Sequence, residues 1–251
     1  MKLKYNFRFL TVLFLVLFLS ACMYPESEEP NQMPNESQIE MVQQAVEQYR
    51  EDTDGLLPIK TVSETREYFE YQVDFDRLVP EYMDERPPIS YEGGGYYQFV
   101  ILDAEENPTV KLADLRITEE IRSLQLRVNG MGEHVQFEET IGPNVYKLDL
   151  DFYNLEENPT VTSPISGGAL NVYYSGGENF IVDYREDIGR IIEDNDLQFE
   201  TGDDVREVLY EYTPIVPIYS PEITVDENND PIFMTNAVSY THLTLPTTPY
   251  V

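Results

Sequence analysis

The chain has 251 residues and a formal net charge of −31, because 47 Asp and Glu outnumber 16 Lys and Arg. This excess of acid disfavours nucleic acid and anionic lipid headgroups as partners, since the field of the protein repels both. A single cysteine excludes an internal disulfide, and only two histidines, His134 and His242, argue against a histidine-rich metal site.

The first 21 residues have the layout of a secretory signal peptide. Lys2, Lys4 and Arg8 precede a run from Phe9 to Leu19 that is almost wholly apolar. This run is shorter than the ~20 residues that a membrane-spanning helix needs. We therefore expect residues 1–21 to be removed as a signal peptide.

The motif Leu19, Ser20, Ala21 and Cys22 resembles the bacterial lipoprotein signal, in which the cysteine is diacylated through its sulfur and becomes the new N-terminus. Two acyl chains, of which palmitate is the familiar type, hold a protein stably on a membrane, whereas one chain binds only marginally. The resemblance implies a lipid anchor at Cys22 on the extracytoplasmic face of the cell membrane. The alternative is an incidental thiol in an ordinary leader.

The mature chain would have 230 residues and 13 basic residues against 47 acidic ones, a net charge of −34. We expect this charge to be diffuse, so that cations are held only diffusely. Residues 23–35, "MYPESEEPNQMPN", contain three prolines and three glutamates and show no apolar periodicity. Residues 22–35 are therefore expected to be the lipidated cysteine and a disordered tether.

A helix is predicted to follow the tether. Ser37 and Glu40 have the spacing of a capping box at a helix start, and Gly55 is a typical helix end. The apolar residues between them recur on one helical face, namely Ile39, Val42, Val46 and Tyr49. Beyond it we expect an extended link at 56–61, a short helical turn within 74–88 and a strand within 93–102.

The hexapeptide "EENPTV" occurs at 105–110 and again at 156–161. It indicates either a duplicated unit or a favoured turn used twice, and the turn is the preferred interpretation because Asn-Pro initiates turns.

Residues 111–130 are predicted as a strand, a short helix and a second strand, because Leu124, Leu126 and Val128 alternate. Further strands are expected at 134–140, 146–153, 168–184 and 198–200, with short helices at 186–192 and 202–212. Together these elements predict an α+β fold with an N-terminal amphipathic helix and a mostly antiparallel sheet. We expect one domain over residues 36–237, with a possible subdivision near 129–144.

Searches for catalytic and metal motifs are mostly negative. The sequence lacks a nucleophile elbow, a zinc-protease helix, a P-loop and a dinucleotide fingerprint, while the many acids leave a carboxylate pair for glycoside hydrolysis open. Asp226, Asn228 and Asp230 alternate as in a calcium loop, but Pro231 and Ala237 stand where glycine and glutamate belong. A hairpin turn is therefore expected there, and neither a metal, a cofactor nor a catalytic residue is assigned.

Two tyrosine pairs lie beside glycines, Tyr96 with Tyr97 and Tyr173 with Tyr174. Such rings could stack on sugars or a peptide, but one ring of each pair must face the core of a strand, so packing is the default interpretation.

These features favour a membrane-anchored extracytoplasmic lipoprotein whose acidic domain is a non-enzymatic binding or envelope-assembly module. Its expected partners are the membrane, through the anchor, and an envelope protein or wall polymer. The alternative is a carboxylate-dependent hydrolase acting on cell-wall polymers.

The segments "CMYP" at 22–25, "GLLPIKT" at 55–61 and "NPTVKLADLRI" at 107–117 resemble the YphF-like lipoproteins of Gram-positive, Bacillus-type bacteria. The resemblance covers most of residues 22–237. It implies a tethered, outward-facing protein of a single-membrane cell, and it supplies no activity and no functional residues.

The last 14 residues, 238–251, contain no charged side chain, although the preceding chain is dense in acids. Residues 238–247, "VSYTHLTLPT", resemble the translation of a transposase-type sequencing adapter. We expect this tail to be non-native, in which case His242 has no role and the tail has no reason to complement a core. The alternative is a genuine Thr- and Pro-rich terminus.

Overall fold

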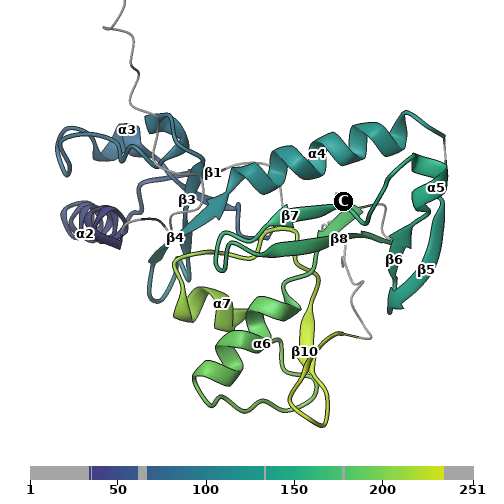
Figure 1. The fold of residues 1–251 in the computed structure, drawn as a ribbon. Helices are drawn as coiled ribbons and strands as arrows, with labels where there is room; N and C mark the ends of the chain where they lie inside the picture. The colour runs from purple at the N-terminus through teal and green to yellow at the C-terminus, as the bar shows by residue number, and fades with distance from the viewer. Residues whose placement is uncertain (1–33, 35, 62–66, 133, 177–178, 235–251) are drawn as a thin grey trace, which may run out of the picture. The chain divides into compact units, whose positions relative to one another are not determined.

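A computed structural model describes residues 34, 36–61, 67–132, 134–176 and 179–234. Within these residues the fold is α+β, with an N-terminal helix followed by mostly antiparallel strands, as the sequence predicts (Figure 1). Among the described helices, none combines the length and the apolar character that a membrane crossing requires. The expected domain limits at 36 and 237, and the subdivision near 129–144, stay predictions.

The N-terminal helix covers one face of a four-stranded antiparallel sheet. Helix α2 (Glu36–Asp52) buries Ile39, Val42, Ala45 and Val46 along one side. The sheet order is β1-β2-β3-β4, with β1 (Ile59–Thr61), β2 (Tyr71–Val73), β3 (Tyr97–Leu102) and β4 (Thr109–Asp114). The short helix α3 (Phe75–Leu78) follows β2 and is capped by the Asp74 side chain.

Strands β3 and β4 contribute buried side chains to both faces of the sheet. Phe99, Ile101 and Leu112 pack in the cluster that contains the α2 side chains. Val100 and Ala113, which alternate with them, belong to a second and larger cluster. Because successive side chains of a strand point to opposite faces, the sheet contributes to both cores.

A second sheet follows helix α4 (Leu115–Asn129). Its strands run in the order β5-β6-β8-β7, and β9 also pairs with β8. The elements are β5 (Phe137–Gly142), β6 (Val145–Leu148), α5 (Leu150–Tyr153), β7 (Thr160–Thr162), β8 (Ala169–Ser175) and β9 (Asn179–Val182).

The C-terminal elements are α6 (Arg185–Asp194), α7 (Glu207–Tyr212), β10 (Ile223–Val225) and β11 (Pro231–Phe233). The segment between α7 and β10 joins the two sheets by backbone hydrogen bonds. Leu112 N donates to Pro214 O at 2.8 Å, and Val182 N donates to Tyr219 O at 2.9 Å. This segment therefore accepts hydrogen bonds from backbone N–H groups of β4 and of β9.

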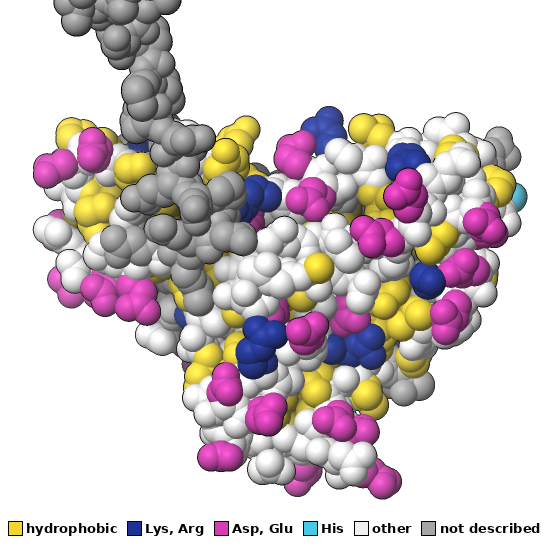
Figure 2. All heavy atoms as spheres, viewed as in Figure 1, with side chains coloured by type: hydrophobic (Ala, Val, Ile, Leu, Met, Phe, Trp, Pro, Cys, Tyr) yellow, Lys and Arg dark blue, Asp and Glu magenta, His cyan; other side chains and the backbone are white. Residues whose placement is uncertain are grey.

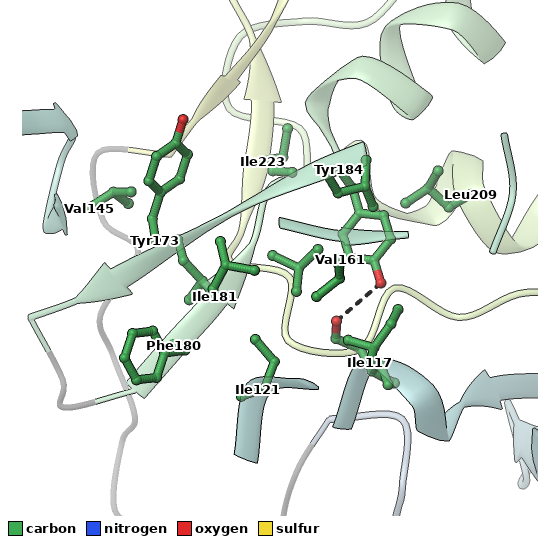
Figure 3. Packing of buried hydrophobic residues seen from close by; sticks show 14 of the residues in the cluster. Ile117, Ile121, Val145, Val161, Tyr173, Phe180, Ile181, Tyr184, Leu209 and Ile223 are labelled. Atoms are coloured by element: carbon green, nitrogen blue, oxygen red, sulfur yellow. Dashed lines mark hydrogen bonds between the residues drawn. The ribbon is translucent and has the colours of Figure 1, made fainter. Parts of the chain in front are cut away.

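The larger core is organised around Tyr184, whose side chain is fully buried. Its hydroxyl donates a hydrogen bond of 3.3 Å to Ile218 O, and Figure 3 shows this end of the ring directed toward the side of the cluster that holds Ile117. A buried hydroxyl without a partner would be costly, so this bond allows the ring to act as core. Burial, followed by the nearby negative charges, raises the pKa of Tyr184.

Most predicted elements are confirmed, including both repeats as turns. Each "EENPTV" copy lies in a turn or bend that leads into a strand, β4 beginning at Thr109 and β7 at Thr160. The hairpin turn between β10 and β11 is also confirmed. Backbone N–H groups of Asp230 and Asn228 donate to the Asp226 carboxylate, and they lower its pKa.

Three local predictions are wrong. The expected strand at 124–128 is the continuation of α4, which buries Ile117, Ile121 and Val128 on one face and leaves Leu126 67% exposed. The expected strand at 146–153 ends at Leu148, because Asp149 caps α5 by accepting from Phe152 N. Residues 198–200 form no strand, since Asn229 and Asp203 side chains accept from Phe199 N and Glu200 N instead.

Candidate functional site

The residues predicted to carry the anchor, Leu19, Ser20, Ala21 and Cys22, lie outside the described residues, as does the tail at 238–251. His134 is exposed on a bend. In the part of the chain that the structure describes, no three His, Cys, Asp or Glu side chains are grouped so that they could hold a metal ion.

The two tyrosine pairs divide as expected, one ring of each facing a core. Tyr97 and Tyr173 expose only 6% and 8% of their surface. Tyr174 is half-buried and packs edge-on against Phe180, with ring centroids 5.6 Å apart. Tyr96 is different, because it is 57% exposed. The candidate surface is therefore at the first pair.

A glycine-rich turn presents Tyr96 together with a second exposed tyrosine, Tyr91, which is 63% exposed. Tyr91 begins the short 3-10 helix η2 (Tyr91–Gly93). Gly95 N donates to Ser90 O at 2.8 Å, so the residues immediately before Tyr91 and Tyr96 are hydrogen-bonded to each other. The two tyrosines consequently leave the turn from adjoining positions, and we call them the tyrosine surface.

The turn is held in place by its own packing. Ser90 is fully buried, and its Oγ donates to Pro87 O at 2.7 Å while accepting from Gly93 N at 3.0 Å. A Cβ on Gly93 would lie 2.2 Å from Pro87 O, and a Cβ on Gly95 would lie 2.2 Å from Ile89 O. Gly94 has a φ of +95°, which favours glycine. All three glycines are thus required by the geometry.

Arg116 lies against the tyrosine surface. Its guanidinium carbon is 5.7 Å from the centroid of the Tyr96 ring and 5.5 Å from that of Tyr97, within the range of cation–π attraction. Its Nη2 donates to the Tyr97 hydroxyl at 3.1 Å. The two nitrogens Nε and Nη2 donate to the Asp114 carboxylate, Nη2 at 2.5 Å. This ion pair fixes Arg116 and balances its charge.

The pair of Asp114 and Arg116 is one of three D-x-R units whose arginine pairs with its own aspartate, a recurrence that the sequence analysis missed. In the fourth D-x-R tripeptide, at 84–86, Arg86 pairs with Asp76 instead. In each unit the Asp Oδ1 accepts from the Arg backbone N–H and, at 2.9 Å, from its Nε. The others are Asp183 with Arg185 and Asp204 with Arg206. The signal is visible in the printed sequence as "DLR", "DYR" and "DVR", each at or shortly before the start of a helix.

Each arginine of the three units also reaches a distant part of the chain. Arg116 reaches Tyr97, the Arg185 guanidinium lies 3.9 Å from the Phe233 ring centroid, and Arg206 Nη1 donates to Glu67 at 2.7 Å. The D-x-R units therefore brace the fold as well as starting helices. The first unit adjoins an exposed ring of the turn, that of Tyr96.

Glu120 lies one helical turn after Arg116 on α4. Partial burial raises its pKa, the negative charge of Asp114 raises it further, and Arg116 opposes both. The buried carboxylate of Asp187 has another use, because it accepts a 2.6 Å hydrogen bond from Ser163 Oγ.

Within the turn, Glu92 pairs with Lys60 of β1. Lys60 Nζ is 3.3 Å from Glu92 Oε1 and 3.9 Å from Asp74 Oδ1, with 38% of the lysine side chain exposed. The turn thus carries an ion pair at Glu92, next in sequence to Tyr91, while the ion pair of Arg116 with Asp114 lies against the ring of Tyr96. Chemically, this arrangement offers flat aromatic faces for stacking and polar groups at their margin.

Residues 35–114 match the model of the YphF family N-terminal domain. The match contains Tyr91, the glycine turn, Tyr96 and Asp114, and it ends two residues before Arg116. No curated protein and no solved structure matches the chain. The N-terminal part of the chain, which carries the tyrosine surface, is thus YphF-like.

Proposed function

We propose that the protein is a lipid-anchored binding module of the bacterial cell envelope. In this proposal Cys22 holds the chain on the extracytoplasmic face of the cell membrane, and residues 23–35 act as a tether. The domain that follows contacts an envelope protein or wall polymer through the tyrosine surface. The observation that carries the proposal is the packed glycine turn that holds Tyr91 and Tyr96 63% and 57% exposed.

Two tyrosines that stay exposed to solvent do not contribute the free energy of folding that their burial would give. A buried tyrosine removes on the order of 150–250 Å² from water, and tyrosine is enriched among the residues that dominate binding energies. Glycine also loses more conformational freedom on folding than any other residue, so a run of three is unfavourable unless the turn needs it. Preorganised exposed rings reduce the entropy lost on binding.

The anchor is tested by replacing Cys22 with Ser in cells that produce the full chain. A serine has no thiol to accept the lipid, so we expect the variant to be released or to accumulate unprocessed. Fractionation into membrane and soluble material measures this. A Cys22→Ser protein that is fully processed and still sediments with the membrane would contradict the anchor.

The binding surface is tested by co-sedimentation of the full chain, kept in detergent, with purified cell-wall material. We expect the double variant Tyr91→Ala/Tyr96→Ala to sediment several-fold less than the wild type, because both rings are removed without loss of core packing. Tyr212→Ala is the matched control, since Tyr212 is also exposed, at 47%, but lies on α7. Equal sedimentation of all three proteins would reject the tyrosine surface as the binding site.

A second candidate function is a carboxylate-dependent hydrolase of wall polymers, favoured by the raised pKa of Glu120 beside Asp114. A glycosidase needs one protonated carboxyl and one carboxylate. Asp114 is poorly suited to the second role, since it exposes 1% of its surface and is held by Arg116. Release of sugar from wall polymer by the wild type, abolished in Glu120→Gln, would favour this hydrolase over the binding module.

A further inference from the structure

We infer that the fold of the YphF-like domain occurs twice in this chain. The first copy is residues 36–114, nearly the whole of the segment that matches the family model, and the second copy is residues 115–183. Each copy begins with a long helix and ends at the aspartate of a D-x-R unit, Asp114 or Asp183. The inference does not depend on what the tyrosine surface binds.

The described elements follow one order in the two copies: a helix, two strands, a four-residue helix and two further strands (Figure 1). These are α2, β1, β2, α3, β3 and β4 in the first copy, and α4, β5, β6, α5, β8 and β9 in the second. In each copy these four strands pair antiparallel in chain order, and the second copy adds β7 beside β8. The second and third strands meet at the same separation in sequence, Gln72 with Val100 and Tyr146 with Tyr174.

Consecutive strands often pair, so local markers must decide whether the copies are related. The first marker lies at the second strand and the short helix. The sequence is "YQVDFD" at 71–76 and "YKLDLD" at 146–151, with three identical residues and apolar residues facing apolar ones in the alignment. The first aspartate caps the short helix in both copies. Asp74 accepts from the N–H two residues on at 3.2 Å, and Asp149 from the N–H three residues on at 2.9 Å.

The second marker is a buried serine in the turn before the third strand. Ser90 and Ser163 expose 0% and 2% of their surface, and the Oγ of each accepts a 3.0 Å hydrogen bond from the backbone N–H three residues on. The fourth residue after each serine has a positive φ, which favours glycine, +95° at Gly94 and +72° at Gly167. The residue after each glycine forms a backbone hydrogen bond with the serine.

The third marker is the end of the fourth strand. In both copies the D-x-R aspartate accepts from the backbone N–H of its arginine, at 2.9 Å from Arg116 and 3.1 Å from Arg185, and the next helix begins there. The third D-x-R unit, at 204–206, precedes α7 without such a strand, so the marker is the strand and the unit together. The "EENPTV" repeat is separate, because its occurrences lie in different connections, β3 to β4 and α5 to β7.

The copies differ in what the turn exposes. Counted from the buried serine, Tyr91 and Tyr96 of the first copy correspond to Pro164 and Ala169 of the second. Tyr96 and Ala169 are both exposed, and the residue after each is buried. Acidic side chains are spread over the face shown in Figure 2 rather than gathered over one part of it, so charge on this face does not set either copy apart. The exposed tyrosines are therefore an addition to a turn that the second copy forms without them.

A crystal structure of the full chain, kept in detergent, tests the duplication directly. When the strands of residues 36–114 are superposed on those of 115–183, we expect three pairs of residues to coincide, namely Asp74 with Asp149, Ser90 with Ser163 and Asp114 with Asp183. The inference is overturned if any of these pairs lies more than one strand spacing, about 4.8 Å, apart.

Equivalent turns also predict which residues the first turn accepts. Tyr91→Pro/Tyr96→Ala introduces the residues of the second copy, and we expect the midpoint of thermal unfolding to stay within about 2 °C of the wild type, since proline is favoured directly after a capping serine. Glu92→Pro is the matched control and should lower the midpoint by about 4 °C or more, because it forces Tyr91 out of its helical conformation.

Glu92→Ala removes the same ion pair without a proline and should change the midpoint by no more than about 2 °C. A double variant Tyr91→Pro/Tyr96→Ala that is as unstable as Glu92→Pro would overturn the equivalence of the two turns. Neither experiment measures binding to the wall, so a failure of the proposed function leaves this inference standing, and the reverse also holds.

Discussion

Asp114 is almost fully buried, and its carboxylate accepts hydrogen bonds from the backbone and the side chain of Arg116. A buried carboxylate is tolerated only when it is paired and hydrogen-bonded, so the two residues act as a unit. The same side chain caps α4 and fixes the arginine that faces Tyr96 and Tyr97. A helix cap and the margin of the candidate site therefore share one residue.

Asp114→Asn tests this double role. The amide keeps the size of the side chain and can still cap the helix, but it loses the charge that pairs with Arg116. We expect the free energy of unfolding to fall by about 1–2 kcal/mol, measured by urea denaturation. The control is Asp151→Asn, an exposed position in α5, where the change should stay within about 0.5 kcal/mol. Equal losses in the two variants would contradict a structural role for the buried pair.

Part of the candidate site could be predicted from single residues. The alternation of strand side chains requires one tyrosine of each adjacent pair to face the core, and both pairs obey it. Which pair leaves a ring in solvent depends on long-range packing. Phe180 covers Tyr174 from a neighbouring strand, whereas Tyr96 precedes β3 and stays 57% exposed beside Arg116. The D-x-R units were visible in the sequence, but their partners Tyr97, Phe233 and Glu67 required the fold.

At the scale of elements, short-range patterns predicted most helices and strands but could not decide between overlapping periods. Residues 115–128 fit both a helix and an alternating strand, and burial of Ile117, Ile121 and Val128 against the larger core selects the helix. The strand expected at 198–200 failed for a related reason. Its backbone N–H groups find side-chain acceptors, one of them Asn229 from the β10–β11 hairpin, which no local pattern reveals.

The glycine turn is the element whose geometry is most restrictive. Gly95→Ala places a Cβ 2.2 Å from Ile89 O, so the turn must move. We expect a loss of about 2 kcal/mol or more in the free energy of unfolding, together with weaker wall binding, because the tyrosines are displaced. Gly168→Ala is the control, since its Cβ would meet only Ser166 Oγ at 3.4 Å. If Gly95→Ala is as stable and as active in binding as Gly168→Ala, the turn is not a rigid support.

At the scale of the molecule, the described residues form two apolar clusters that share the strands β3 and β4. Around these cores lies a surface dense in acids, whose mutual repulsion opposes folding. The net charge follows from the composition alone, and from it we expect cations to be held only diffusely. The arrangement of the cores depends on contacts between distant segments, such as Leu112 with residues 214–216, and no sequence pattern indicated it.

Diffuse charge and a specific cation site predict different responses to salt. If the charge is diffuse, the midpoint of thermal unfolding should rise smoothly with NaCl, because screening weakens the repulsion between like charges. Calcium chloride at equal ionic strength should act in a similar way. Saturable stabilisation by micromolar calcium, unmatched by sodium chloride, would establish a specific calcium site and refute the diffuse interpretation.

The most direct test of the anchored binding module is photo-crosslinking in living cells. The crosslinking amino acid p-benzoylphenylalanine replaces Tyr91, Tyr96 or, as the control, Tyr212, one position at a time, in the full chain with Cys22 intact. The account predicts membrane-associated protein that crosslinks to wall polymer or an envelope protein from positions 91 and 96 and not from position 212. Membrane-associated protein that gives no product from 91 and 96, or the same products from all three positions, would contradict it.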